Sequence, residues 1–72
     1  MIKIYVHIPG IGKREIETDE EQMKGKNVSE AASLWFNETG DFTSIRLPLK
    51  NKTQIILRGN TYKNSVFEFV DE

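Results

Sequence analysis

The stretch IKIYVHIPGIG, residues 2–12, decides how the chain begins its fold. Aliphatic side chains occupy every second position of its first part, at Ile2, Ile4, Val6 and Ile8. This alternation is typical of a half-buried strand. Pro9 cannot extend a ladder and Gly10 accepts the positive φ of tight turns, so the chain should reverse here. We expect a hairpin whose second strand, residues 13–18, is weak, turns Ile16 inward and lies at an edge of the sheet.

Helical signals follow this hairpin. Residues 27–30 (NVSE) have the spacing of a capping box, and apolar residues continue from them at helical intervals. Gly40 stands where a left-handed residue closes a helix, so we expect the main helix over residues 28–39. A second capping-box spacing at residues 18–21 (TDEE) predicts a short helical turn that contains Met23 and acts as a connector.

Beyond the helix the pattern becomes that of β-strands. Three apolar runs occur, at residues 42–49, 55–57 and 66–70. Residues 50–52 suit a short hairpin and Gly59 opens a longer turn. The sequence therefore predicts one small α+β domain over residues 1–72, with one main helix packed on a four- to five-stranded, mostly antiparallel sheet. The expected order of elements is β-β-α-β-β-β.

A hairpin followed by one helix and further strands resembles the β-grasp arrangement of ubiquitin-like domains. The resemblance lies in the order of the elements. The chain ends Phe69-Val70-Asp71-Glu72, without the Gly-Gly tail of conjugated ubiquitin-like modifiers, so conjugation chemistry is not implied. The alternative architecture is a meander of antiparallel strands with one helix packed across a face.

Composition limits the class of protein. The chain has 72 residues, of which 38% are hydrophobic and 29% charged, as in ordinary globular domains. With no cysteine, it can form neither disulfides nor a thiolate nucleophile. No apolar run approaches the roughly 18 residues of a membrane-spanning helix, and residues 1–8 lack the continuous apolar core of a signal peptide. We therefore expect a cytoplasmic protein that does not enter a membrane.

Charge is distributed unevenly along the chain. Residues 42–67 contain no acid and five basic side chains, Arg46, Lys50, Lys52, Arg58 and Lys63, although the net charge of the chain is −1. Residues 1–41 hold five basic and eight acidic residues. If residues 42–67 fold into one sheet, the protein presents a basic side that orients charged partners.

We interpret the basic segment as a binding surface. The partner-binding residues that we expect are Arg46, Lys50, Lys52, Arg58, Tyr62 and Lys63, with Trp35 as an aromatic anchor on the helix. The main hypothesis is an acidic protein partner, with the chain acting as an inhibitor or adaptor, like those that phages and mobile elements carry. The alternative is a nucleic-acid-binding sheet that contacts phosphates and stacks bases. A homodimer through a strand edge is compatible with both hypotheses.

Catalysis is not expected. His7 is the one histidine, so neither a His-based triad nor a multi-histidine metal site can form in one chain. Residues 10–13 (GIGK) lack the spacing of a Walker loop, and the acidic run at residues 15–21 lacks the order of a calcium-binding loop. We therefore expect no enzyme activity, no cofactor and no metal, and assign these stretches to a turn and a solvated helix start.

Overall fold

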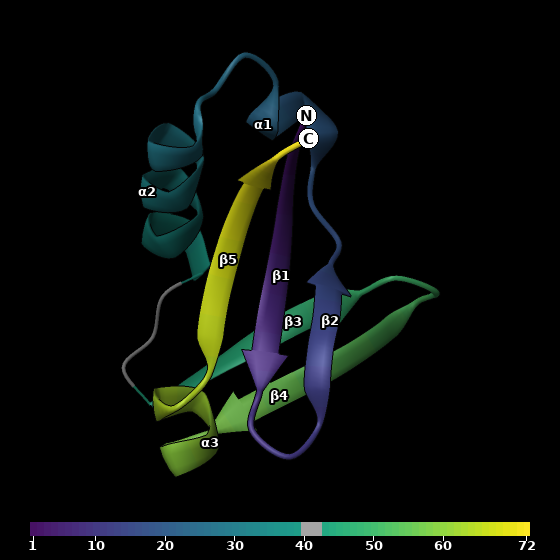
Figure 1. Cartoon of the computed structure of the whole chain (residues 1–72), viewed down its shortest axis with the longest axis vertical. Coiled ribbons are helices and arrows are strands. Elements are labelled where there is room, and N and C mark those ends of the chain that lie inside the picture. Colours follow the sequence, from purple (N-terminus) through teal and green to yellow (C-terminus); the bar gives the residue numbers. More distant parts are fainter. Residues whose placement is uncertain (40–42) are drawn as a thin grey trace.

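The structure is a computed structural model that describes residues 1–39 and 43–72. In chain order its elements are β1 (Ile2–Ile8), β2 (Gly12–Ile16), α1 (Glu20–Met23), α2 (Val28–Thr39), β3 (Ser44–Leu49), β4 (Thr53–Arg58), α3 (Gly59–Lys63) and β5 (Val66–Asp71) (Figure 1). The five strands form one antiparallel sheet in the order β4-β3-β2-β1-β5. The predicted α+β class and antiparallel sheet are thus confirmed. The roles predicted for Gly40 and Phe42 fall outside the described residues.

β1 pairs with β2 on one side and with β5 on the other, antiparallel to both. Its alternation of residue types predicts its burial, since Ile4 and Val6 are 0% exposed while the residues between them are half-buried. The strands β1 to β4 are neighbours in chain order, as in a meander, and β5 pairs with the other side of β1. This order and the antiparallel pairing of β1 with β5 therefore support the alternative, a helix packed on an antiparallel sheet.

Within the described residues, β2 and β3 are joined by one residue pair, Ile16 and Leu49. Beside this pair, the backbone N–H of Glu17 donates to the C=O of Pro48 at 2.8 Å. Pro48 has no N–H to donate to β2, so it is tolerated at the point where the pairing between β2 and β3 ends. The β3–β4 hairpin then diverges and passes behind β1 and β2 (Figure 1). β2 is therefore an interior strand, and its prediction as an edge strand is wrong, although its pairing with β3 is this short.

The crossing of the hairpin over β1 and β2 encloses the core. Aliphatic side chains from the inner faces of β3 and β4 join those of β1 and β2 in one buried cluster: Ile45, Leu47, Leu49 and Leu57. Leu47 is 0% exposed. Burying one such side chain contributes about 1.5–3 kcal/mol, so this face holds the hairpin in place more than the short β2–β3 pairing does.

α2 spans the residues predicted for the main helix. Its capping box is reciprocal: the N–H of Glu30 donates to Oδ1 of Asn27 at 2.8 Å, and the N–H of Asn27 donates to Oε1 of Glu30 at 3.1 Å. The helix lies alongside β5 (Figure 1). There Trp35 packs against Phe67 and Phe69, with ring centroids 5.3 and 5.7 Å apart. These rings complete the core on the side of β5.

Two short helices act as connectors. α1 is the predicted helical turn, with Met23 buried. Its N-cap is Asp19 rather than the first residue of the predicted capping box, Thr18: Oδ1 of Asp19 accepts a hydrogen bond from the N–H of Glu21 at 3.1 Å. α3 was not predicted, because Gly59 and Asn60 have the chemistry of a turn. Gly59 adopts φ +56°, which glycine tolerates without strain, and the chain then closes one helical turn before β5.

Candidate binding surface

The outer face of the β3–β4 hairpin presents two arginines beside an exposed isoleucine. In the ladder Arg46 lies opposite Ile56, and Arg58 follows Ile56 by two positions on the same strand. Such side chains point to one face of the sheet, here the face turned away from the core. Arg46 and Arg58 are exposed, and Ile56 is 56% exposed. We call Arg46, Gln54, Ile56 and Arg58 the hairpin surface.

A shallow groove of about 600 Å³ lies over this surface. It is lined by Thr43, Ser44, Arg46, Ile56, Arg58 and Gly59. In the part of the chain that the structure describes, neither Arg46 nor Arg58 forms an ion pair or a side-chain hydrogen bond. Each guanidinium group can therefore bind a carboxylate through two parallel hydrogen bonds. The groove combines two anion-binding groups with one apolar contact.

Lys50 and Lys52 lie at the tip of the hairpin, at the far end from α3. The Nζ atom of Lys50 is 3.3 Å from Oε2 of Glu15, so its charge is partly neutralised. Lys52 adopts φ +60° in the turn and is exposed. The tip therefore extends the basic side of the molecule mainly through Lys52.

Tyr62 and Lys63 belong to α3. The Tyr62 side chain is half-buried and its ring packs against Phe67, with 6.4 Å between centroids. Lys63 is exposed in the last turn of the helix. The structure thus brings Lys63 near the α3 end of the hairpin, whereas the ring of Tyr62 belongs to the margin of the core.

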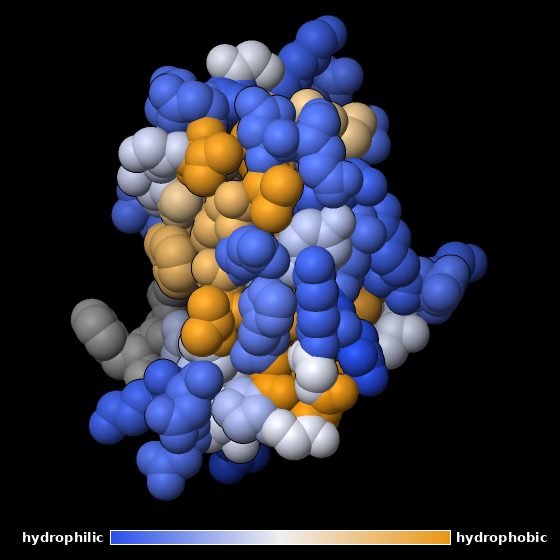
Figure 2. All heavy atoms as spheres, in the orientation of Figure 1, coloured by the Kyte–Doolittle hydropathy of each residue, from blue (hydrophilic) through white to orange (hydrophobic). Residues whose placement is uncertain are grey.

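Trp35 does not lie on the surface. It is 8% exposed, and this burial corrects its assignment as an anchor for a partner. The next residue, Phe36, points about 100° further round the helix and is 44% exposed. Figure 2 shows hydrophobic residues gathered along the boundary between α2 and β5, and Val28 and Val66 are also exposed on these elements. Phe36 is therefore the helix aromatic that a partner can reach.

The outer face of β1, β2 and β5 pairs its charges internally. The Oε1 atom of Glu68 lies 3.0 Å from Nε2 of His7 and 4.0 Å from Nζ of Lys13. Nζ of Lys13 also lies 4.2 Å from the centroid of the Tyr5 ring. The Tyr5 hydroxyl donates to Oε2 of Glu72 at 3.2 Å. This face, which is turned toward the viewer in Figure 2, therefore has little net charge to offer a partner.

The same environment affects the ionisation of Tyr5. Desolvation of the side chain, followed by the charge and hydrogen bond of Glu72, raises the pKa of Tyr5 above its ordinary value of 10.0. The hydroxyl thus stays protonated and remains a donor to Glu72.

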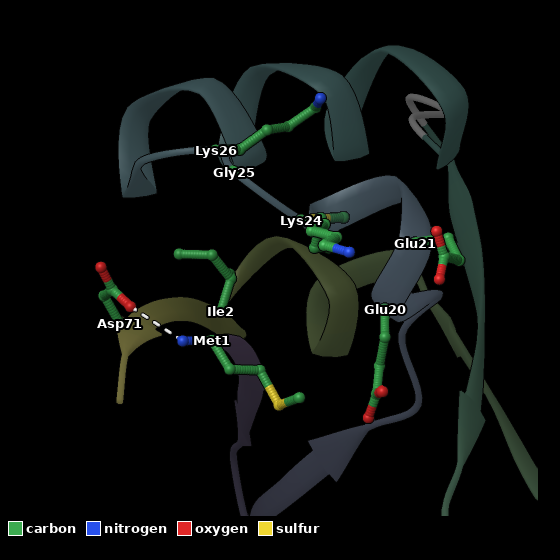
Figure 3. Close-up of a pocket in the computed structure, with 9 residues that line it drawn as sticks. Met1, Ile2, Glu20, Glu21, Lys24, Gly25, Lys26 and Asp71 are labelled. Carbon is green, nitrogen blue, oxygen red and sulfur yellow. Dashed lines mark hydrogen bonds and ion pairs between the residues drawn. The ribbon is translucent and has the colours of Figure 1, made fainter.

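A second hollow, of about 380 Å³, lies between the amino terminus, α1 and the end of β5 (Figure 3). It is lined by Met1, Ile2, Glu20, Glu21, Met23, Lys24, Gly25, Lys26 and Asp71. The terminal ammonium of Met1 is 3.2 Å from Oδ1 of Asp71. Figure 3 shows the charged groups of Glu20, Glu21 and Lys26 pointing in different directions. Because these charges are mixed in sign and do not converge, the hollow selects no charged ligand.

Ile56 is the candidate contact residue that the sequence did not identify. It stands in the unbroken apolar run of residues 55–57, where alternation cannot tell which side chain faces outward. Arg58, two positions further along the strand, was the available signal, since residues two apart share a face. The register with β3 determines that the Ile56 side chain faces outward, because Ile56 lies opposite the exposed Arg46.

Within residues 1–39 and 43–72, no three His, Asp or Glu side chains gather in an arrangement that could hold a metal ion. None of the helices in these ranges is long and apolar enough to cross a membrane. Comparison of the chain with protein-family models, with curated proteins and with solved structures finds no significant match.

Proposed function

We propose that this chain is a non-catalytic binding protein whose hairpin surface contacts an acidic surface of another protein. The observation that carries the proposal is that Arg46 and Arg58, which form no ion pair within residues 1–39 and 43–72, lie beside the exposed Ile56. Arginine is enriched among the residues that dominate protein–protein binding energy, and apolar contacts exclude water around such groups. A partner that presents carboxylates around an apolar residue complements this surface.

The uneven distribution of charge would also orient an acidic partner as it approaches the hairpin surface. Residues 43–67 hold no acid, and among the described residues Lys50 is the one basic side chain of this segment that forms an ion pair, with Glu15. The field of the other basic side chains is therefore not cancelled by a direct partner. Such a field steers an acidic partner during diffusion, and salt screens it. A chain without cysteine suits a reducing compartment, so we place the interaction in the cytoplasm and assign the chain the role of an inhibitor or adaptor.

Nucleic acid is the alternative partner, because the same basic residues can contact phosphates. Proteins that grip single strands also need exposed rings on which bases stack. Among the tyrosines, Tyr62 packs against Phe67, while Tyr5 lies on the outer face of β1 with Lys13 over its ring. These positions favour a protein partner over a single-stranded nucleic acid.

Charge reversal at two places on the molecule tests the proposal. One variant combines Arg46→Glu with Arg58→Glu, and the control combines Lys24→Glu with Lys26→Glu, which changes the net charge equally near α1. Each immobilised protein is incubated with cell lysate, with and without nuclease, at low and moderate salt. We expect a discrete protein, rich in acidic residues, that the native chain and the control retain after nuclease and the hairpin variant does not.

Two results would contradict the proposal. Retention of the same protein by the hairpin variant would remove Arg46 and Arg58 from the contact. Recovery of nucleic acid at low salt, lost at moderate salt, would instead assign the hairpin surface to phosphate binding, since phosphate contacts give affinity a steep salt dependence.

A further inference from the structure

β4 lies at one end of the sheet, and its ladder with β3 determines which backbone groups face the free side. Pro48 turns its C=O away from β4, to the N–H of Glu17. Backbone groups alternate in direction along an antiparallel ladder, and residues directly opposite share that direction. Gln54, which is paired with Pro48, therefore turns its N–H and C=O away from β3. Ile56, two residues further on, does the same.

The free side of β4 is more open than the other edge of the sheet. At that other edge, α2 lies alongside β5 (Figure 1), and Phe36 packs against Phe67 and Phe69 with ring centroids 6.0 and 6.1 Å apart. β4 is contacted by α3 instead, a helix of five residues that begins where the strand ends. Along β4 itself, Gln54 and Ile56 are exposed. The strand contains no proline and no inward-pointing charge, two of the usual protections of an edge.

We propose that the acidic partner adds an extended strand to the free edge of β4, an inference that rests on the proposed function. Residues of the added strand that lie opposite Ile56 and Arg58 project onto the same outer face as those two side chains. A carboxylate beside Arg58 and an apolar side chain beside Ile56 complement the surface. The partner segment is therefore an extended peptide in which an acidic and an apolar residue stand two positions apart.

Charge argues for such a partner over a second copy of the chain. Pairing two β4 strands antiparallel and edge to edge would bring Lys52, just before the start of the strand, and Arg58, at its end, near Arg58 and Lys52 of the second copy. Like charges across a strand pair are destabilising. An acidic segment removes this repulsion, and its backbone forms hydrogen bonds with Gln54 and Ile56 whatever its sequence.

A proline substitution tests the backbone contact without disturbing the fold. Gln54→Pro removes one N–H that faces the free edge, and the hydrogen bonds between β3 and β4 stay intact. Gln54→Ala is the matched control, because it removes the same side chain and keeps the N–H. The probe is a synthetic peptide of about eight residues in which Glu and Val, two positions apart, alternate with Thr. A second peptide, with Lys in place of Glu, controls for charge.

We expect the native chain and Gln54→Ala to bind the acidic peptide equally, and Gln54→Pro to bind it about tenfold more weakly. Fluorescence anisotropy measures this affinity, and circular dichroism checks that each variant is folded. In the native chain, the peptide should also slow hydrogen exchange at the amides of Gln54 and Ile56, a readout that needs no variant.

The outcomes separate this inference from the proposed function. If Arg46→Glu with Arg58→Glu weakens peptide binding but Gln54→Pro does not, the hairpin surface binds through side chains and strand addition is wrong. Failure of the peptide to bind, or to protect the two amides, overturns strand addition while the lysate experiment still decides the proposed function. Self-association that Gln54→Pro abolishes would assign the edge to a second copy and contradict the inference.

Discussion

Ile16 lies directly opposite Leu49, and this pair is where the β1–β2 hairpin and the β3–β4 hairpin meet in the sheet. Ile16 is 1% exposed and Leu49 is 8% exposed, so both side chains belong to the core as well as to the ladder. The direction in which the β3–β4 hairpin leaves the sheet, and with it the orientation of the hairpin surface, depends on this junction.

Truncation at the junction should therefore be costly. Ile16→Ala and Leu49→Ala should each lower the free energy of unfolding by about 2–5 kcal/mol, because each removes buried methyl groups and leaves a cavity. The double variant should lose less than the sum of the two, since the side chains share one cavity. Urea denaturation followed by tryptophan fluorescence measures these changes. Ile11→Ala is the control: Ile11 is 56% exposed, and a loss as large as that of Ile16→Ala would contradict the argument.

Trp35 and Phe36 should respond differently to truncation although they are adjacent. Trp35→Ala should cost about 3–5 kcal/mol, because the ring is buried against Phe67 and Phe69. Phe36→Ala should cost less, about 1–2 kcal/mol, because this ring is already 44% exposed, although it loses its contacts with Trp35, Phe67 and Phe69. Chemical denaturation monitored by circular dichroism measures both. Equal costs for the two variants would mean that Phe36 is as much part of the core as Trp35.

The capping box at the start of α2 should contribute measurably to stability. Asn27→Ala removes the acceptor of the Glu30 N–H and should cost about 1 kcal/mol. Ser29→Ala, at an exposed position of the first turn, should change the free energy of unfolding by no more than about 0.5 kcal/mol. Thermal and urea unfolding of the two variants test this difference. Identical stabilities would show that the reciprocal hydrogen bonds contribute nothing net.

Tyr5 should make stability fall at alkaline pH. Its pKa in the folded state is raised, so above the ordinary value of 10.0 the unfolded chain loses this proton before the folded chain does. In that range the unfolded state binds fewer protons, and the free energy of unfolding decreases as pH rises. At lower pH both states are protonated and Tyr5 adds no slope. Unfolding of the native chain and of Tyr5→Phe, compared between about pH 9 and pH 11, should show a shallower decline for the variant. Parallel curves would contradict the raised pKa of Tyr5 in the folded state.

Elements with local causes could be predicted from the sequence. The alternation in residues 2–8 predicted β1, and the capping box formed by Asn27 and Glu30 predicted the start of α2. α3 was missed because a turn and a single helical turn share the same residue types. The basic charge of the hairpin surface was also predicted, since Arg46 and Arg58 are visible as residue types. Which aromatic of the helix is exposed could not be predicted, because Trp35 and Phe36 fit the helical pattern equally well.

The sequence by itself determined the positions of the strands and the main helix, and the concentration of basic residues after residue 42. These features depend on neighbours in the chain, through alternation, capping and turn chemistry. Tertiary structure alone decided that Ile56 faces outward beside Arg46, and that β4 is an edge strand. A shift of register by one residue would turn every side chain of a strand to the other face. The register and order of the strands arise from contacts between distant segments, such as the pair of Ile16 and Leu49, which no local pattern encodes.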